Sequence, residues 1–427
     1  MRTALEIVLW TALALIVWTQ LGYAAILALL ARVLRPRPSE EDAPPRAHPE
    51  GRTLKGTGRQ ATNTAEHSGA SQDPALPSVS LIVAAHDEQA VVAEKVRNAL
   101  ALDYPRELLE VIVACDGCTD ATAAQAREAG ADLVLDLLRG GKIRAQDAAV
   151  ARARGELVAF SDANSLWEPD ALRVLVGAFA DARVGYACGQ VRFFQAPSTS
   201  PAQAAKATNQ EGLYWRYEMA QRLAESRLRS ITAGNGAIYA TRRESYIVVD
   251  PIMGHDLSFP FNMVKRGWRA VYVPEAGASE KMVPSIEGEL ARKRRMMSHT
   301  WPIVLHGGML DPRGYGVAYA LMILSHRVLR YCTAFLHVLA FAANLALVLA
   351  YPPGGTGPTH PASGVYTVTL ALQVALFVCA GLGGLVHARP LLVARYYVLT
   401  TASLALGLWD WLRHGTSAAW EAAEGTR

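Results

Sequence analysis

The sequence of 427 residues has little of what marks a nucleic-acid-binding, secreted or disordered protein. Only 19% of its residues are charged, and 42 basic against 38 acidic residues leave a net charge of +4, too small to indicate nucleic acid as a partner. Five cysteines in so long a chain exclude a disulfide scaffold, and their odd number favours reduced thiols and a cytoplasmic soluble part. Long apolar runs exclude disorder over the whole length.

Common nucleotide-binding and metal motifs are also missing. No G-x-G-x-x-G follows a predicted strand, and Gly140-Gly141-Lys142 lacks the earlier glycine and the following Ser or Thr of a P-loop. The spacing of Cys115 and Cys118 suits zinc or redox chemistry, but Gly117 and Asp120 favour a turn, and no second pair of ligands is evident. A Rossmann dinucleotide site and a P-loop therefore have no support.

Apolar residues are concentrated at the two ends of the chain. Residues 7–31 carry no charge and are long enough to cross a bilayer, which predicts an N-terminal transmembrane helix over residues 5–34. Residues 315–330 mix apolar side chains with basic ones, as in a helix lying in the membrane interface. Three more transmembrane helices are predicted within residues 331–413, namely Tyr331–Tyr351, Val365–Val386 and Leu391–Leu412.

Basic residues and composition predict how these segments are arranged. Arg32, Arg35 and Arg37 flank the first span and place the region after it in the cytoplasm. Four spans then put the tail, residues 414–427, on the opposite side of the membrane. Residues 35–77 are rich in Pro, Gly, Ser, Thr and charge, which predicts a flexible linker.

Residues 78–308 show an alternating pattern of strands and helices. Short apolar runs predict strands over 79–84, 109–114, 133–135 and 157–160. Helical spacing between them predicts helices over 88–102, 121–129 and 146–154. This alternation predicts an α/β fold, a doubly wound, mostly parallel sheet, flanked here by transmembrane α-helices. Ligands of such sheets bind beyond the carboxyl ends of the strands.

Acidic residues follow three of the predicted strands. Asp87 and Glu88 follow the first, Asp116 the second and Asp162 the fourth. A single acid after a strand is usually a helix N-cap, and this is our interpretation of Asp120. Carboxylates gathered at one sheet edge repel one another unless a cation is present, and oxygen ligands favour Mg²⁺ or Mn²⁺, which commonly hold a diphosphate.

These motifs carry a resemblance to a known family. The stretch from Pro77 to about Val191, with VSLIVAAHDE, CDGCTDAT and RGGKIRAQDAAVARARGELVAFSDAN, resembles membrane-bound family 2 glycosyltransferases of the GT-A fold, the cellulose synthase and hyaluronan synthase-like superfamily. The resemblance implies a metal at Asp162 and Asn164, with Asp162 dominant because an amide is the weaker cation ligand. It implies a donor-binding set of Ala85, Asp87, Glu88, Asp116, Lys142, Asp162 and Asn164.

The resemblance continues to about Trp301. TAGNGAIY, residues 232–239, is similar to an acceptor-side segment, which implies acceptor contacts at Gly234, Asn235 and Gly236, although a plain tight turn is the alternative. GHDLS matches the segment that holds the family's general base. This match implies that Asp256 is the base, with His255 in place of the usual Glu and counted among the acceptor-side residues. A helix N-cap is the alternative for Asp256.

The last motif of the family, Q-x-x-R-W, is matched poorly. ARKRRMMSHTW, residues 291–301, has the arginines and a later Trp but lacks the Gln and the spacing. Arg292, Arg295 and Trp301 are the candidates for binding the departing diphosphate. The alternative is a basic helix that contacts anionic lipid headgroups.

Together these features imply an inverting glycosyltransferase that moves a sugar from a nucleotide diphosphate-sugar to a hydroxyl of a lipid-linked or glycan acceptor. Membrane lipids are further partners, and the altered last motif favours a single addition over a processive polysaccharide synthase. A catalytically silent membrane scaffold and a nucleotidyltransferase stay open as alternatives. The hypothesis requires Asp116, Asp162 and Asp256, far apart in sequence, to converge around a single cleft that is big enough for an activated saccharide.

Overall fold

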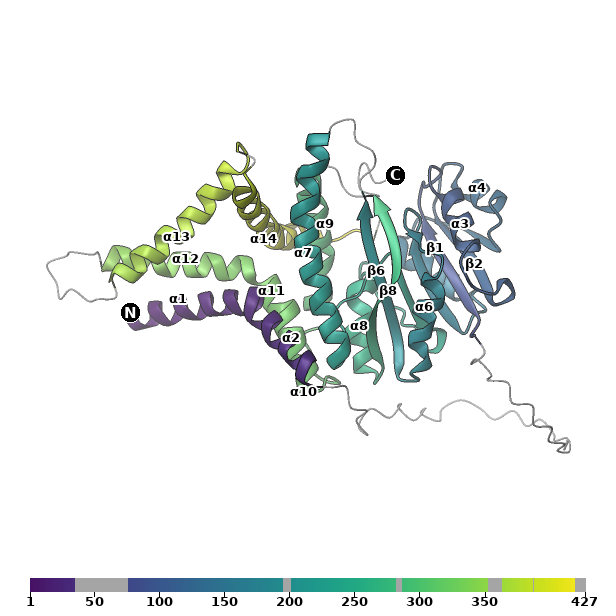
Figure 1. The fold of residues 1–427 in the computed structure, drawn as a ribbon, viewed down its shortest axis with the longest axis horizontal. Coiled ribbons are helices and arrows are strands. Elements are labelled where there is room, and N and C mark those ends of the chain that lie inside the picture. Colours follow the sequence, from purple (N-terminus) through teal and green to yellow (C-terminus); the bar gives the residue numbers. More distant parts are fainter. Residues whose placement is uncertain (35–75, 195–200, 282–285, 352–362, 387, 419–427) are drawn as a thin grey trace.

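The computed structural model describes residues 1–34, 76–194, 201–281, 286–351, 363–386 and 388–418. An α/β domain adjoins an arm of long helices, and the N-terminus lies at the far end of that arm (Figure 1). Helices α7 (Pro201–Leu228) and α9 (Ile286–Leu305) stand between the arm and the sheet (Figure 1). The predicted linker over residues 35–77 lies almost entirely outside the described residues.

The α/β domain is built on one eight-stranded sheet with the order β3-β2-β1-β4-β7-β6-β8-β5. The predicted parallel half is confirmed, because β1 pairs in parallel with β2 and β4, and β2 with β3. The other half is mixed: β7 is antiparallel to β4 and β6, β5 is antiparallel to β8, and β6 and β8 are parallel. The strands are β1 (Val79–Ala85), β2 (Leu109–Asp116), β3 (Leu133–Leu137), β4 (Leu157–Asp162), β5 (Leu166–Trp167), β6 (Val184–Phe194), β7 (Ile238–Arg242) and β8 (Arg269–Lys281).

The central strand β1 shows why an unbroken apolar run forms a strand here. All seven of its residues are buried. Successive side chains of a strand point to opposite faces, so Leu81 joins the hydrophobic core on one face and Ile82 the core on the other. Both faces of the sheet are therefore covered, as the sequence pattern predicts for parallel strands.

Two helices of the domain lie within their predicted ranges, and a third, predicted over residues 146–154, is shifted by four residues towards the N-terminus at both ends. Helices α3 (Val92–Leu100) and α4 (Thr122–Glu128) lie within the predicted ranges. Helix α5 (Lys142–Val150) begins four residues before the predicted start at residue 146. Its N-cap is Gly141, whose φ of +94° is accessible to glycine at little cost. The helix therefore begins directly after Gly140 and Gly141.

Four helical segments are long and apolar enough to cross a membrane, as predicted. The first, Arg2–Val33, consists of α1 (Arg2–Val17), a π-helical turn and α2 (Tyr23–Val33). The others are α12 (Thr333–Ala350), residues Gly364–Leu382 of α13 (Ser363–Leu382), and α14 (Arg389–His414).

The segment predicted as an interfacial helix is joined to the α/β domain by a buried cluster of charges. The segment comprises α10 (Val317–Met322), a π-helical turn over Ile323–Val328 and α11 (Leu329–Tyr331). We call the following side chains the junction network: Tyr23, Glu218, Glu225, Thr232, His326, Arg327 and Arg330. The basic side chains of this segment thus point into the protein, and a position in the membrane interface stays a prediction.

Two glutamates of α7 accept most bonds in the junction network. Glu225 accepts from Tyr23 Oη at 2.7 Å and from the backbone N–H of Thr232 at 3.0 Å, and it lies 2.7 Å from His326 Nδ1. Glu218 accepts from Arg330 at 2.7 Å. Burial alone would raise the pKa of both carboxyls, but the neighbouring basic side chains outweigh it and lower the pKa of each.

The C-terminal segment returns to the α/β domain. Arg294 of α9 donates to both carboxylate oxygens of Asp410 on α14, at 2.5 and 2.6 Å. Beyond the helix, Thr416 Oγ1 donates to the carbonyl of Ser298, and the carbonyl of Ala418 lies so close to Gly141 that a Cβ there would be 2.1 Å from it. The tail was expected on the opposite side of the membrane, and for residues 415–418 that expectation is wrong. Residues 419–427 lie outside the described ones.

Candidate active site

The three predicted aspartates all meet the loop Gly140–Lys142. Asp162, at the end of β4, forms an ion pair with the ammonium of Lys142, the first residue of α5. Asp116, at the end of β2, binds the backbone of the two glycines. Asp256 interacts electrostatically with Lys142 from α8 (His255–Lys265). The three aspartates therefore come together at this loop, whereas a cleft for an activated sugar and their roles in it stay predictions.

Asp116 holds the loop through backbone hydrogen bonds. Its Oδ1 accepts from the N–H of Gly140 at 2.6 Å and from that of Gly141 at 3.0 Å. The side chain is almost completely buried, with 1% of the residue exposed. Asp116 thus positions the loop that carries Lys142, and direct contact with a nucleotide base stays a prediction.

Asp256 lies at the start of α8, but the helix cap is a different residue. The N-cap is Gly254, and no side chain caps this helix with a hydrogen bond, so the N-cap interpretation of Asp256 is wrong. Gly236 lies between Asp256 and Lys142: a Cβ added there would be 3.9 Å from Lys142 Nζ and 4.0 Å from Asp256 Cβ. The carboxylate of Asp256 is half-buried and adjoins a position that has no side chain.

The electrostatics keep Lys142 charged. Burial by itself would lower its pKa, but the carboxylates of Asp162, Asp256 and Glu280 outweigh burial and raise it. A charged ammonium at this position suits the binding of an anionic leaving group.

The sequence did not reveal Glu280, near the end of β8, which adds a carboxylate beside Asp162. We call Asp162, Asp256 and Glu280 the acidic cluster. Glu280 Oε1 is buried and makes no hydrogen bond within the part of the chain that the structure describes. Burial first, and then the charge of Asp162, raise the pKa of Glu280 to about 7. A carboxylate oxygen left unsatisfied beside Asp162 fits a divalent cation, which would satisfy both groups. Asn164 is half-buried two residues after Asp162, and its role as a ligand stays a prediction.

Lys95 of α3 is a second charged residue near Asp162 that the sequence analysis did not single out. It is fully buried, its Nζ makes no hydrogen bond within the described ranges, and it lies 5.2 Å from the ring centroid of Trp167. Burial lowers the pKa of Lys95 to about 7, while Asp162 and Glu280 oppose the shift. A signal was available, because Lys95 occupies the buried face of α3 together with apolar residues.

Most of the predicted acceptor-side residues have structural roles. Gly234 has no room for a side chain, because a Cβ there would be 1.9 Å from Tyr186 Oη. Asn235 is buried, and its Oδ1 accepts from the N–H of Ala237 at 3.1 Å. Gly236 is the member of this set that borders the acidic cluster.

His255 is enclosed by aromatic rings. It stacks on Phe259 with ring centroids 4.0 Å apart, its Nδ1 lies 2.8 Å from Tyr239 Oη, and it is 2% exposed. Burial, and then the charge of Lys142, lower its pKa to about 3. His255 is thus packed at the start of α8, and an acceptor-side role for it stays a prediction.

The predicted donor-side residues at the end of β1 and directly after it also differ in exposure. Ala85 and Glu88 are buried, and the backbone N–H of Glu88 donates to Thr122 Oγ1 at 2.8 Å. Asp87 remains partly exposed, and its Oδ1 accepts from the N–H of Thr119 at 2.8 Å. The loops after β1 and β2 are thus joined by hydrogen bonds.

The predicted diphosphate residues separate along α9. Arg292 interacts electrostatically with Glu280, which places it beside the acidic cluster. Arg295 is exposed and interacts electrostatically with His299, and His299 also interacts electrostatically with Asp256. Trp301 lies nine residues, or about 13 Å of helix rise, beyond Arg292. It is buried and donates to the carbonyl of Leu404 on α14, so its contacts do not support a diphosphate role.

The fold and this site define a glycosyltransferase of the GT-A type. Residues 77–298, just over half of the chain, match the family described as glycosyltransferase-like family 2. The chain belongs to this family. The fold likeness extends to a solved mannosyltransferase from Pyrobaculum calidifontis in complex with GDP-Man and Mn²⁺, with a TM-score of 0.62, 21% identity, and coverage of 96% of this chain and 99% of that one.

Curated relatives match over shorter stretches. An N-acetylglucosaminyltransferase of Mesorhizobium japonicum is 27% identical over 237 residues, which are 51% of this chain and 54% of the relative. A beta-monoglucosyldiacylglycerol synthase of Nostoc is 34% identical over 117 residues, 26% of this chain and 25% of the relative. The chain thus spans about half or less of the length of these relatives.

Proposed function

We propose that this chain transfers a sugar, with inversion at the anomeric carbon, from a nucleotide diphosphate-sugar to a hydroxyl of a lipid-linked or glycan acceptor. The observation that carries the proposal is the meeting of Asp162 and Asp256 at Lys142, at the carboxyl ends of the parallel strands. Asp162 can bind on the donor side and Asp256 on the acceptor side, with the ammonium of Lys142 between them. One solved structure of the same fold, the mannosyltransferase in complex with GDP-Man and Mn²⁺, supports this donor class.

Departure of the diphosphate requires positive charge. Asp162 and Glu280 would hold a divalent cation, Mg²⁺ or Mn²⁺, which supplies charge to the leaving group. Lys142 is charged and mounted on a loop that Asp116 fixes, and Arg292 lies beside the same carboxylates. These cations stabilise negative charge as it develops, which is often the largest contribution to such a reaction.

The acceptor hydroxyl must lose its proton as the new bond forms. Asp256 would take this proton through its half-buried carboxylate, since Gly236 leaves space beside it. General-base help of this kind is typically worth about 10²–10⁴-fold in rate. His255, held by aromatic rings, keeps the first turn of α8 and therefore Asp256 in place.

A membrane setting follows from the four apolar helices and from glycolipid synthases among the relatives. We place the α/β domain in the cytoplasm, because Arg32, Arg35 and Arg37 follow the first span. A multi-pass protein with its site beside the membrane suits a lipid-linked acceptor.

The test is to incubate the purified chain with UDP-, GDP- and dTDP-sugars and to measure the nucleoside diphosphate released, with and without Mn²⁺ or Mg²⁺. We expect cation-dependent release with one donor that Asp162→Ala abolishes. Release of pyrophosphate would identify a nucleotidyltransferase instead. No release from any donor, with or without membrane lipids, would support the silent scaffold.

A further inference from the structure

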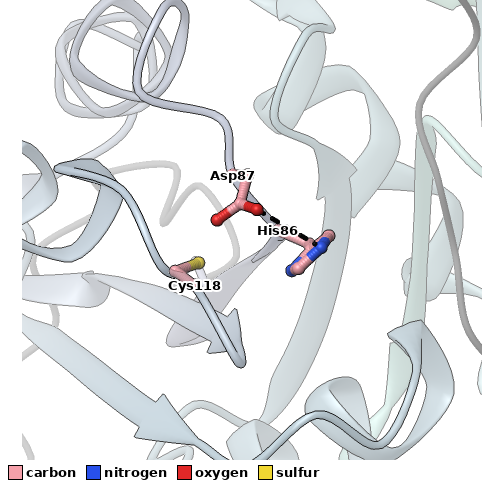
Figure 2. Close-up of side chains that lie close together, drawn as sticks. All are labelled: His86, Asp87 and Cys118. Carbon is pink, nitrogen blue, oxygen red and sulfur yellow. Dashed lines mark ion pairs between the residues drawn. The ribbon is translucent and has the colours of Figure 1, made fainter.

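The loops after β1 and β2 bring three different side chains together outside the cluster around Lys142. His86 and Asp87 follow β1, and Cys118 lies just after β2. One ligand atom from each, a ring nitrogen, a carboxylate oxygen and the sulfur, lies within 4.8 Å of the other two. Figure 2 shows the three side chains facing one another, with the pair between His86 and Asp87 dashed.

His86 is oriented as a metal ligand would be. Its Nδ1 lies 2.8 Å from the backbone carbonyl of Asp116, and because a carbonyl can only accept, Nδ1 carries the proton. Nε2 is then the unprotonated nitrogen, and it lies 3.5 Å from Asp87 Oδ2. A hydrogen bond from one ring nitrogen to a carbonyl is the usual way in which proteins orient a histidine that binds metal through the other.

Asp87 is held in an unusual backbone conformation. Its φ is +49°, and among the described residues it is the one non-glycine with positive φ. Such a conformation costs about 1–3 kcal/mol and persists where surrounding contacts impose it. Here the N–H of Thr119 binds Asp87 Oδ1, which turns the carboxylate towards Cys118.

We propose that His86, Asp87 and Cys118 form a binding site for a soft divalent cation such as Zn²⁺. Nitrogen, oxygen and thiolate together are a zinc-type ligand set, whereas Mg²⁺ and Mn²⁺ favour oxygen alone. Zn²⁺ would bond Cys118 Sγ as the thiol proton leaves to solvent. The three protein ligands leave a fourth position open for water.

The bound ion would join the two loops that border the predicted nucleoside position. Because Asp87 is also a predicted donor ligand, Zn²⁺ and the donor should compete; this second part of the inference rests on the proposed function. The cation proposed at Asp162 and Glu280 would have oxygen ligands alone, so the two ions would differ in chemistry and place.

Cobalt is a suitable probe, because Co²⁺ bound to a thiolate has a near-ultraviolet charge-transfer band and oxygen sites do not. Titration of the purified full-length chain with Co²⁺ should produce this band, and Zn²⁺ should remove it by displacement. Cys118→Ser should abolish the band, whereas Cys115→Ser and Asp162→Ala should retain it. His86→Ala, which keeps the thiol, should weaken Co²⁺ binding at least about 10-fold.

The outcomes separate this inference from the proposed function. Absence of the band, its survival in Cys118→Ser, or unchanged affinity in His86→Ala would overturn the metal site while leaving sugar transfer untouched. Loss of sugar transfer would not alter the band. In the second arm, Zn²⁺ should raise the KM for the donor in the wild-type chain and not in Cys118→Ser; equal inhibition of both would disprove competition at this site.

Discussion

Lys142 and Asp162 lie 20 residues apart in the sequence and form an ion pair at the carboxyl end of β4. The pair forms because Gly141 allows α5 to begin directly after the glycine loop, and Asp116 fixes that loop through its backbone N–H groups. One short segment therefore links the end of β2 to the end of β4. The following predictions concern this arrangement and the elements that support it.

Removing the charge of Asp256 should stop chemistry without weakening donor binding. Asp256→Asn keeps the shape of the side chain but cannot take the acceptor proton, so kcat should fall by about 10²–10⁴-fold. Donor affinity, measured by calorimetry, should change little. Asp250→Asn, at a solvent-exposed position a few residues earlier, serves as the matched control. Near-normal turnover of Asp256→Asn would remove this residue from the role of base.

Glu280→Gln should weaken the binding of the divalent cation. The substitution removes a buried carboxylate beside Asp162 while keeping nearly the same volume, so the affinity for Mn²⁺ should fall at least about 10-fold. Paramagnetic resonance of free Mn²⁺ measures this directly, without a sugar donor. Glu275→Gln, exposed on the same strand, should bind Mn²⁺ like the wild type. Equal affinity of the two variants would exclude Glu280 as a ligand.

The stability of the domain should fall with pH in part because of His255. Burial lowers its pKa to about 3, whereas an unfolded histidine has a pKa of about 6.5. Between these values the unfolded state binds more protons, so stability is full above pH of about 6.5 and falls by up to about 1.4 kcal/mol per pH unit below it. His255→Gln should flatten the difference in unfolding midpoint between about pH 7 and pH 5. Parallel curves for the two proteins would contradict this.

Breaking the junction network should destabilise the chain. Glu225→Ala removes the acceptor of Tyr23 and of the Thr232 N–H, and it removes the nearer of the two carboxylates beside His326. Removing one partner of a buried charged set typically costs about 3–5 kcal/mol. Thermal unfolding in detergent should show a clear drop for this variant and almost none for Glu244→Ala, whose side chain is exposed. A similar midpoint for both would mean that the network contributes little.

The sequence predicted the first half of the sheet well, because parallel strands buried on both faces are continuous apolar runs. The acids after those runs could be assigned to one edge for the same reason. Glu280 could not be found in this way, since it lies on a strand of the mixed half, whose neighbours follow from tertiary packing. The burial of His255 could not be predicted either, because its aromatic cage combines residues from β4, β7 and α8.

The side of the membrane on which the C-terminal tail lies was predicted wrongly for a related reason. Counting spans treats every apolar helix as a crossing, but α14 packs along α9 through Arg294 and Asp410. A residue such as Asp410 near the end of an apolar helix gives no hint in sequence of which partner it meets.

The contact between Ala418 and Gly141 has a practical consequence for labelling experiments. A fluorescent protein attached after the last residue should share the compartment of the sugar-transferring half, whereas one attached before Met1 should face the other compartment. In sealed vesicles, added protease should therefore digest one of the two fusions and leave the other intact.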